Sequence, residues 1–306
     1  MSRRRKGEDI HGWLLLDKPL EMSSAQAVAK VKWLFNANKA GHAGTLDPLA
    51  SGMLPIALGE ATKTVPFIMD GRKVYSFTAR WGAETTTDDL EGTVTRESPL
   101  RPSAAEIEAV LPRFVGTITQ VPPAFSAIKR DGKPAYELAR AGEDVVMEPR
   151  QVEIFSLKMV YSDAEETQFE VLCGKGTYVR ALARDLGRAL GGAAHVSRLR
   201  REQVGPFARE SMIPLEKLVD LAHKDPGREA IFSALRPLQT ALDDIPALAL
   251  SEVDAARLLH GQPVHLNGRP MGVTSGDVVL AMRDDVPVAL AHFTGTSLEP
   301  RRVFNL

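Results

Sequence analysis

Four stretches of the chain show the apolar runs or the polar–apolar alternation that are typical of β-strands. The first is a short apolar run that ends in a Lys-Pro turn, and the second alternates along its length. Successive side chains of a strand point to opposite faces of a sheet, so alternation indicates a strand with one buried face. The four predicted strands are residues 12–17, 73–81, 152–160 and 167–173.

Three other segments repeat apolar residues at the spacing of an α-helix. The first opens with Ser23 and Gln26, which fit a capping box, and continues with Val28, Val31 and Leu34 on one face. The predicted helices are residues 24–35, 103–114 and 177–190.

Residues 41–55 have the sequence GHAGTLDPLASGMLP, with three glycines and two prolines. Glycine raises the entropic cost of a regular element, and proline removes a backbone hydrogen-bond donor. We therefore expect this segment to be a loop without a long regular element.

The pattern changes again near residues 244–250. Ser251 and Asp254 fit another capping box and Gly261 is a typical C-terminal stop, so a short helix is expected between them. Short apolar runs separated by turns follow at 263–266, 278–282 and 287–293. Residues 246–306 are therefore expected to form a small β-rich appendage.

The composition is that of a soluble globular protein, with 44% apolar and 25% charged residues. A length of 306 residues suggests two domains, or one large domain with an appendage. The single cysteine, Cys173, excludes an intrachain disulfide, so we expect a reducing, cytoplasmic location. Acidic residues follow the basic start of the chain, and no apolar run has the length of a membrane span. Neither a signal peptide nor a membrane segment is expected.

Motifs for metals and nucleotide cofactors are absent from the sequence. The seven histidines show no metal-ligand spacing, and there is no CxxC, HExxH or glycine-rich phosphate-binding motif. An enzyme with this sequence would therefore work with its side chains alone, without a metal or a cofactor.

The net charge of −1 hides an uneven distribution. Residues 175–209 hold eight Lys and Arg against two acids, whereas residues 84–108 are acidic and are expected to be solvated. For Arg184 and Arg188 alone, a solvated face of an amphipathic helix is the favoured interpretation. When residues 198–201 are added, a phosphate-binding surface becomes an equal alternative.

Several motifs occur in a fixed order along most of residues 12–207. They are Leu16-Asp17-Lys18-Pro19, the run GHAGTLDPLASGMLP, Lys73-Val74-Tyr75, Gln120-Val121-Pro122-Pro123 with Ser126-Ala127, Gly176-Thr177-Tyr178-Val179-Arg180, and Leu199-Arg200-Arg201. In order and spacing, this series resembles the bacterial tRNA pseudouridine synthase B family.

The resemblance implies an α+β fold. A pseudouridine-synthase catalytic domain with a mixed, mainly antiparallel sheet is expected at residues 11–245, after a basic tail at 1–10. A small β-rich, PUA-like domain is expected at 246–306, and the polar segment 122–148 is expected to be an arm that contacts RNA.

The implied activity is isomerisation of uridine to pseudouridine at position 55 in the T loop of tRNA. The target base is flipped out of the loop before it reacts. We expect tRNA as the partner, no cofactor, no obligate protein partner, and a monomer.

The motif match also implies roles for individual residues. Asp47 is the essential carboxylate, which either attacks C1′ of the ribose or removes the 2′ proton. Arg180 orients Asp47 and favours its charged form, and Tyr75 stacks on the uracil and takes part in proton transfer at C5. Further substrate-binding positions are His42, Tyr178, Leu199 and Lys18. For Lys18, a structural role and a phosphate contact both remain open.

Three residues depart from the family pattern: Glu21, Ser23 where threonine is usual, and Phe125 where tyrosine is common. Glu21 stands where the family usually has glycine. A left-handed backbone at Glu21 would be strained, because its Cβ crowds the following carbonyl.

Three other functions are compatible with parts of the sequence. A hydrolase of glycosidic bonds would need a second carboxylate, which Asp88, Asp89 or Glu91 could supply. A non-catalytic RNA-binding or folding-assistance protein would not need Asp47. A guide-RNA-type pseudouridine synthase subunit would work together with partner proteins.

Overall fold

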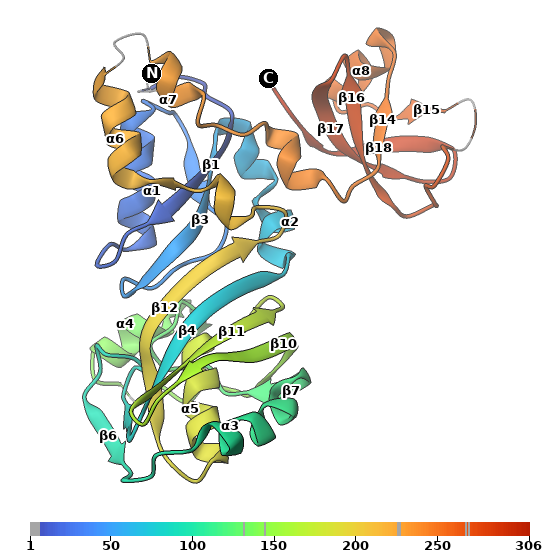
Figure 1. Ribbon diagram of the computed structural model, residues 1–306. Helices are drawn as coiled ribbons and strands as arrows, with labels where there is room; N and C mark the ends of the chain where they lie inside the picture. Colours follow the sequence, from blue (N-terminus) through green and yellow to red (C-terminus); the bar gives the residue numbers. More distant parts are fainter. Residues whose placement is uncertain (1–6, 131, 144, 225–227, 267, 269) are drawn as a thin grey trace.

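The computed structural model describes residues 7–130, 132–143, 145–224, 228–266, 268 and 270–306. Residues 1–6, most of the expected basic tail, lie outside this set. Within the described part, the chain forms one long sheet, one smaller C-terminal sheet, and helices that cover them (Figure 1). The fold is α+β, as expected.

The long sheet contains nine described strands in the order β13-β1-β3-β12-β4-β11-β10-β7, with β2 paired to β3. The β1–β13 and β3–β12 pairs are parallel and the other pairs are antiparallel, so the sheet is mixed and mainly antiparallel. The strands are β1 (Gly12–Lys18), β2 (Ala40–His42), β3 (Ala50–Leu58), β4 (Lys73–Trp81), β7 (Gly116–Gln120), β10 (Arg150–Ser162), β11 (Glu166–Cys173), β12 (Ala194–Val204) and β13 (Ile213–Pro214).

Helices pack on both halves of this sheet. They are α1 (Ser24–Leu34), α2 (Val65–Asp70), α3 (Ala104–Val110), α4 (Ala135–Arg140), α5 (Val179–Ala189), α6 (Leu215–Lys224) and α7 (Glu229–Phe232). Short 3₁₀ helices lie at Gly59–Lys63, Leu111–Phe114, Arg209–Ser211 and Leu238–Leu242. Two short hairpins complete this part of the chain: β5 (Ala83–Thr85) with β6 (Val94–Glu97), and β8 (Lys129–Arg130) with β9 (Lys133–Pro134).

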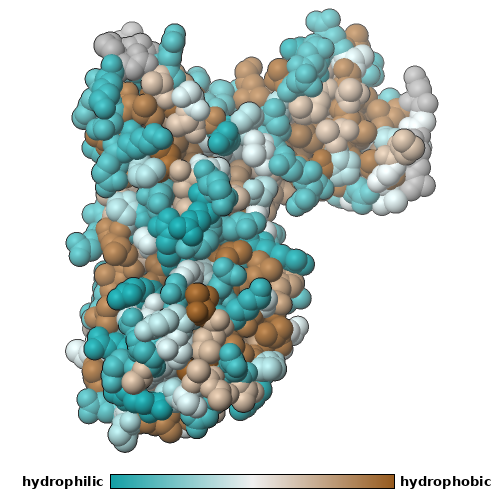
Figure 2. Space-filling view, viewed as in Figure 1, coloured by the Kyte–Doolittle hydropathy of each residue, from teal (hydrophilic) through white to brown (hydrophobic). Residues whose placement is uncertain are grey.

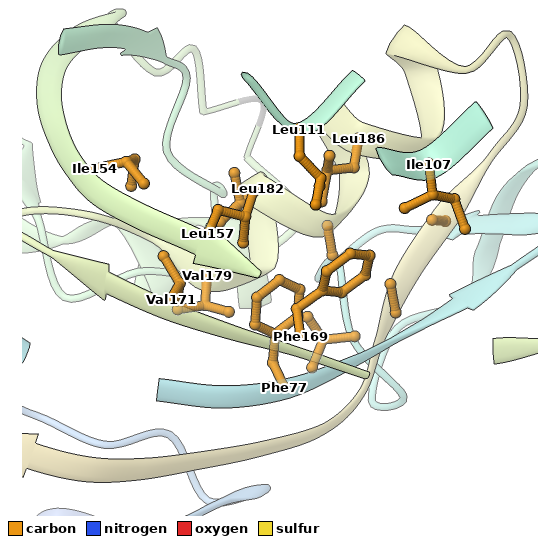
Figure 3. Close-up of a cluster of buried hydrophobic side chains, with 14 of the residues drawn as sticks. Phe77, Ile107, Leu111, Ile154, Leu157, Phe169, Val171, Val179, Leu182 and Leu186 are labelled. Carbon is orange, nitrogen blue, oxygen red and sulfur yellow. The ribbon is translucent and has the colours of Figure 1, made fainter. Parts of the chain in front are cut away.

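The apolar run in β1 is continuous because the sheet is buried on both faces there. Leu14 and Leu16 pack into a cluster with residues of α1 and α6, whereas Trp13 and Leu15 belong to a cluster on the other side. The other half of the sheet is covered by α5 and α3. Figure 3 shows Leu182 and Leu186 of α5 over Phe77 and Phe169.

The smaller sheet has the order β14-β16-β17-β18-β15 and carries α8 (Glu252–Leu259). Its strands are β14 (Ala247–Ala249), β15 (Val264–His265), β16 (Val278–Arg283), β17 (Val286–Phe293) and β18 (Ser297–Val303). The side chain of Ser251 caps α8, as the sequence predicted. A β-rich C-terminal domain is therefore confirmed, and it stands to one side of the long sheet (Figure 2).

The two parts share an apolar interface. Leu280, Leu290 and Phe304 of the C-terminal domain lie in the same buried cluster as Trp13 and Phe207 of the long-sheet domain. Polar contacts surround it: Lys63 Nζ donates to the Val303 carbonyl at 2.7 Å, and the Asn305 amide donates to Glu60 at 2.9 Å. These contacts fix the position of the C-terminal domain relative to the long sheet.

Most predicted elements are confirmed within a few residues, but the loop expected at 41–55 is wrong. This segment includes the end of β2 and much of the nine-residue strand β3. The carbonyl of Pro55 accepts a hydrogen bond from the Ala43 amide at 2.9 Å. Its nitrogen points to the same side, away from β1, so the missing N–H of proline breaks no bond to β1. Gly52 supplies a second irregularity, with φ of 96°.

Candidate active site

A cavity of about 460 Å³ opens where the two halves of the long sheet meet. Its size is typical of a small-ligand site. Five of the residues that the sequence singled out line it: Asp47, Tyr75, Tyr178, Arg180 and Leu199. They come from four elements, namely the loop before β3, β4, the start of α5, and β12.

Asp47 and Arg180 form the central ion pair of the cavity. Arg180 Nε lies 2.9 Å from Asp47 Oδ2; the arginine side chain is 5% exposed and the aspartate is 38% exposed. Nη1 of Arg180 donates to the Thr87 carbonyl at 2.7 Å and lies 3.5 Å from Asp89, and Nη2 donates to the Phe125 carbonyl at 2.8 Å. All three guanidinium nitrogens are therefore engaged, which fixes the orientation of the carboxylate.

Two buried side chains, Ser24 and Arg201, hold the loop that carries Asp47. The Ser24 hydroxyl donates to the Leu46 carbonyl at 2.9 Å and accepts from the Leu46 amide at 2.8 Å. Arg201 donates to the carbonyls of Met53 and Gly44 at 2.7 and 3.0 Å. The sequence analysis missed both roles. A signal for Ser24 was present, because it lies at helical spacing on the buried face of α1 with Ala27.

Lys18 is completely buried, so it is not available for a phosphate contact. Its Nζ donates to the carbonyls of Met22 and Pro19 at 2.7 and 2.8 Å, which ties the turn after β1. Burial lowers the pKa of Lys18 to about 8, with Asp47 acting in the opposite direction. Of the two roles left open for Lys18, the structure favours the structural one. Glu21 in the same turn has φ of 62°, a left-handed conformation that is strained for a residue with a Cβ.

Two tyrosines and a leucine form apolar walls of the cavity. Tyr75 lies on β4 beside Arg201, and burial raises the pKa of Tyr75 although Arg201 opposes the shift. Tyr178 precedes α5, its amide donates to Gln120 at 2.8 Å, and burial raises its pKa as well. Both phenols are therefore protonated near neutral pH. Leu199 pairs with Ala50 and with Phe77 in the centre of the sheet.

His42 does not line this cavity. It is half-buried in β2, and no described residue hydrogen-bonds to its Nδ1. Burial lowers the pKa of His42, and the positive charge of Arg201 adds to this effect. A neutral imidazole is therefore expected near neutral pH.

The acidic segment is not solvated where it meets α5. Asp88 and Asp89 are 5% and 6% exposed, so the expectation of solvated carboxylates is wrong for both. Asp89 reaches Arg180, but the carboxylates that line the main cavity are those of Asp47 and Asp70. None of Asp88, Asp89 and Glu91, the residues considered for the second acid of a hydrolase, lines this cavity, and Asp70 lies 2.9 Å from Lys175 in an ion pair. This disfavours the hydrolase as it was predicted.

The basic segment is neutralised by acids from elsewhere in the sequence. Arg184 is buried and lies 2.8 Å from Asp88, so the solvated-face interpretation is wrong for this residue. Arg188 contacts Glu84 at 2.6 Å. All eight basic residues of 175–209 have a carboxylate or carbonyl partner; the others are Lys175, Arg180, Arg198, Arg200, Arg201 and Arg209. Arg180, Arg184 and Arg201 are therefore buried with internal partners, whereas Lys175, Arg198 and Arg209 stay exposed in surface ion pairs.

Two other features were sought among the described residues. No group of three or more His, Cys, Asp or Glu side chains in them is arranged to hold a metal ion. None of their helices is long and apolar enough to span a bilayer.

The chain is similar to proteins of known family along nearly its whole length. Residues 32–179 match the N-terminal domain of the TruB family pseudouridylate synthases, and residues 180–243 match the C-terminal domain of tRNA pseudouridylate synthase B. The chain is 56% identical to tRNA pseudouridine synthase B of Bradyrhizobium diazoefficiens, covering 99% of this chain and 88% of that protein. It is 51% identical to tRNA pseudouridine synthase B of Sinorhizobium medicae, covering 99% of each.

Solved structures agree with these sequence matches. A chain of a Cbf5-Nop10-Gar1 complex has a TM-score of 0.75 and 29% identity, covering 96% of this chain and 85% of that one. A chain of an H/ACA RNP bound to a substrate RNA containing 2′-deoxyuridine has a TM-score of 0.76 and 26% identity, covering 100% and 92%. Both family models match, and the identity of this chain to the tRNA pseudouridine synthases B is about twice its identity to the two solved chains. The chain therefore belongs to the tRNA pseudouridine synthase B family.

Proposed function

We propose that this chain converts uridine to pseudouridine at position 55 in the T loop of tRNA, with Asp47 as the essential carboxylate. The observation that carries this proposal is the placement of Asp47 in a cavity of about 460 Å³, held by Arg180 and faced by the ring of Tyr75. One oriented carboxylate and one aromatic wall suit a single extruded pyrimidine nucleotide.

The reaction breaks the N1–C1′ bond, turns the uracil, joins C5 to C1′, and releases the C5 hydrogen as a proton. Asp47 begins it either by attacking C1′ or by removing the 2′ proton. The raised pKa of Tyr75 keeps its phenol protonated, so the ring stacks on the base and the phenol can exchange a proton near C5. Extrusion of the base costs a few kcal/mol of stacking, which contacts elsewhere on the RNA must offset.

Residues 122–148 are our candidates for those contacts. Lys129, Lys133 and Arg140 are exposed in this arm, near the side of the cavity that Ser126 lines. We further propose a division into a catalytic domain at 11–245 and a PUA-like domain at 246–306 that adds an RNA contact. The apolar interface shared by the two sheets packs the two domains against each other.

The two RNA-related alternatives are less well supported. A non-catalytic RNA-binding protein would not need Asp47, nor an arginine that is bonded to Asp47, Asp89 and the Phe125 carbonyl. The guide-RNA-type subunit is disfavoured because identity is 51–56% to tRNA pseudouridine synthases B and 26–29% to the chains of the guide-RNA complexes. We propose a cytoplasmic monomer that acts without a cofactor or an obligate protein partner.

The test is release of tritium from a tRNA transcript labelled at C5 of its uridines. We expect the purified protein alone to release one equivalent, and Asp47→Asn to lose turnover while tRNA binding by filter retention is kept. The asparagine has the shape of aspartate but neither attacks carbon nor accepts a proton. Turnover by Asp47→Asn would remove the assigned role of Asp47, and free uracil as the product would favour a hydrolase.

A further inference from the structure

Two arginines one turn apart on α5 hold the point where the arm leaves the catalytic domain. Arg180 Nη2 donates to the Phe125 carbonyl, and Arg184 Nη2 donates to the Val121 carbonyl, each at 2.8 Å. Residues 121–125, the root of the arm, follow directly after β7. Both bonds therefore hold the root against α5.

A second nitrogen of each arginine, Nη1, reaches the turn at 87–89. Arg180 contacts the Thr87 carbonyl and Asp89 as well as Asp47, and Arg184 Nη1 lies 2.8 Å from Asp88 Oδ2. The arm root, this turn and Asp47 are thus connected through one layer of buried guanidinium groups.

Asp88 carries two costs that a purely structural residue would avoid. Its φ is 59°, which is strained for a residue with a Cβ, and it is 5% exposed. Burial raises its pKa to about 6, and the nearby Arg184 and Arg180 only partly oppose this shift. Buried ion pairs often contribute little net stability, so stability alone does not account for this pair at the arm root.

The space around the pair lies between the arm and the domain. A cavity of about 290 Å³ is lined by Asp88 and Arg184, by residues 121–124 at the start of the arm, and by Val145 and Met147 near its end. The pair therefore contacts the arm root at the edge of an unfilled space, where the arm can change position at low packing cost.

We infer that Arg184 and Asp88 are a positioning pair that fixes the arm root against the turn carrying Asp89. The pair thereby presents the arm for RNA docking, while Arg180 separately holds Asp47. This inference rests on the proposed function, because it assigns the arm to RNA. Arg184 does not touch the substrate in this scheme.

Arg184→Lys tests the pair, and Arg188→Lys is its matched control one turn further along α5. Lysine keeps the charge and the helix propensity but loses the planar fork that bonds Asp88 and Val121 together. Arg188 bonds Glu84, and neither is hydrogen-bonded to the arm root, although both line the same cavity.

For Arg184→Lys we expect a KM for tRNA about tenfold higher, as for loss of one hydrogen bond to a charged group, with kcat nearly unchanged. Amide hydrogen exchange in residues 121–130 should become faster. Arg188→Lys should change neither quantity. Equal KM and equal arm exchange in the two variants would overturn the inference, whatever their melting temperatures.

Asp88→Gly is the second variant, in case Arg184→Lys does not fold. Glycine adopts the φ of 59° without strain and removes the acceptor, so this variant should raise KM and speed arm exchange in the same way. Wild-type protein without tritium release would refute the proposed function. The exchange comparison would still test the contact between Arg184 and the arm root, since that measurement needs no turnover.

Discussion

At the scale of single residues, the protein uses buried charge where its chemistry requires orientation. Arg180 reaches Asp47, Asp89 and two backbone carbonyls, and Arg201 supports the loop of Asp47 from below. Each of these cations gives up hydration, which is offset only because its nitrogens have fixed partners. At Asp88 the ion pairs do not fully offset the loss of hydration, because its pKa is raised although two arginines lie beside it.

Asp88→Asn should therefore stabilise the fold at pH 8. The pKa of Asp88 is about 6 in the folded state against an ordinary 3.8, so its favourable contribution is present below pH 4 and is lost as pH rises through 6. Asparagine mimics the protonated carboxyl. We expect a gain of on the order of 2 kcal/mol at pH 8, shrinking towards zero near pH 4, measured by urea unfolding. A variant less stable than the wild type at pH 8 would contradict this reasoning.

Motifs in the sequence identified residues that line the cavity much better than the residues that support them. Asp47 and Arg180 belong to contiguous motifs, and the structure places them 2.9 Å apart. Ser24 acts on a loop 22 positions away, and the carboxylate partners of Arg184 and Arg188 come from about 100 positions away. Local patterns carry no information about such long-range pairs. The acidic segment was therefore expected to be solvated, and the basic segment to be either a solvated face or a phosphate-binding surface.

At the scale of elements, the start of α1 has two functions in adjacent residues. Ser23 is the N-cap, in a capping box with Gln26, and Ser24 in the first turn bonds both backbone groups of Leu46. The helix terminus thus fixes the loop of the catalytic carboxylate while it satisfies its own amides.

Comparison of Ser24→Ala with Ser23→Ala separates these functions. Both should lower stability, Ser23→Ala by about 1 kcal/mol through loss of the cap, and Ser24→Ala by about 1–3 kcal/mol because the buried Leu46 groups lose their partner. Only Ser24→Ala should lower the single-turnover rate of tritium release at saturating tRNA. Equal rates for the two variants would show that Ser24 does not position Asp47.

The prediction of strands failed where polar residues lie inside the sheet and are paired in hydrogen bonds or ion pairs. The strand β12 lies in the centre of the sheet between β3 and β4. Its sequence is nevertheless basic and includes HVSRLRRE. It tolerates arginine there because Arg201 bonds backbone carbonyls and Arg200 bonds Asp17. The apolar strands β1, β4 and β11 needed no such contacts, and their alternation or apolar runs were sufficient to predict them.

At the scale of the whole molecule, charge that is clustered in sequence is dispersed in space. The basic residues of 175–209 face acids from several other elements, and hydrophilic and hydrophobic residues are mixed over the face in Figure 2. Cations free to contact RNA are more evident in the arm, where Lys129 and Lys133 are exposed.

The salt dependence of tRNA binding should therefore follow the arm. A phosphate contact contributes about −0.7 to −0.9 to the slope of log K against log salt concentration. Lys129→Ala should make the slope less steep by about that amount. Arg113→Ala, which removes an exposed charge after α3, should leave the slope unchanged. Equal slopes for the wild type and Lys129→Ala would remove Lys129 from the contact surface.

The apolar cluster shared by the two sheets has a consequence for selectivity. Because Leu280, Leu290 and Phe304 are packed against Trp13 and Phe207, the C-terminal domain stays at a constant separation from Asp47. A ligand that bridges both must already have the matching dimensions, since no hinge is available to adjust the span. Discrimination of this kind depends on the length and folded shape of the ligand and needs no contact with base edges.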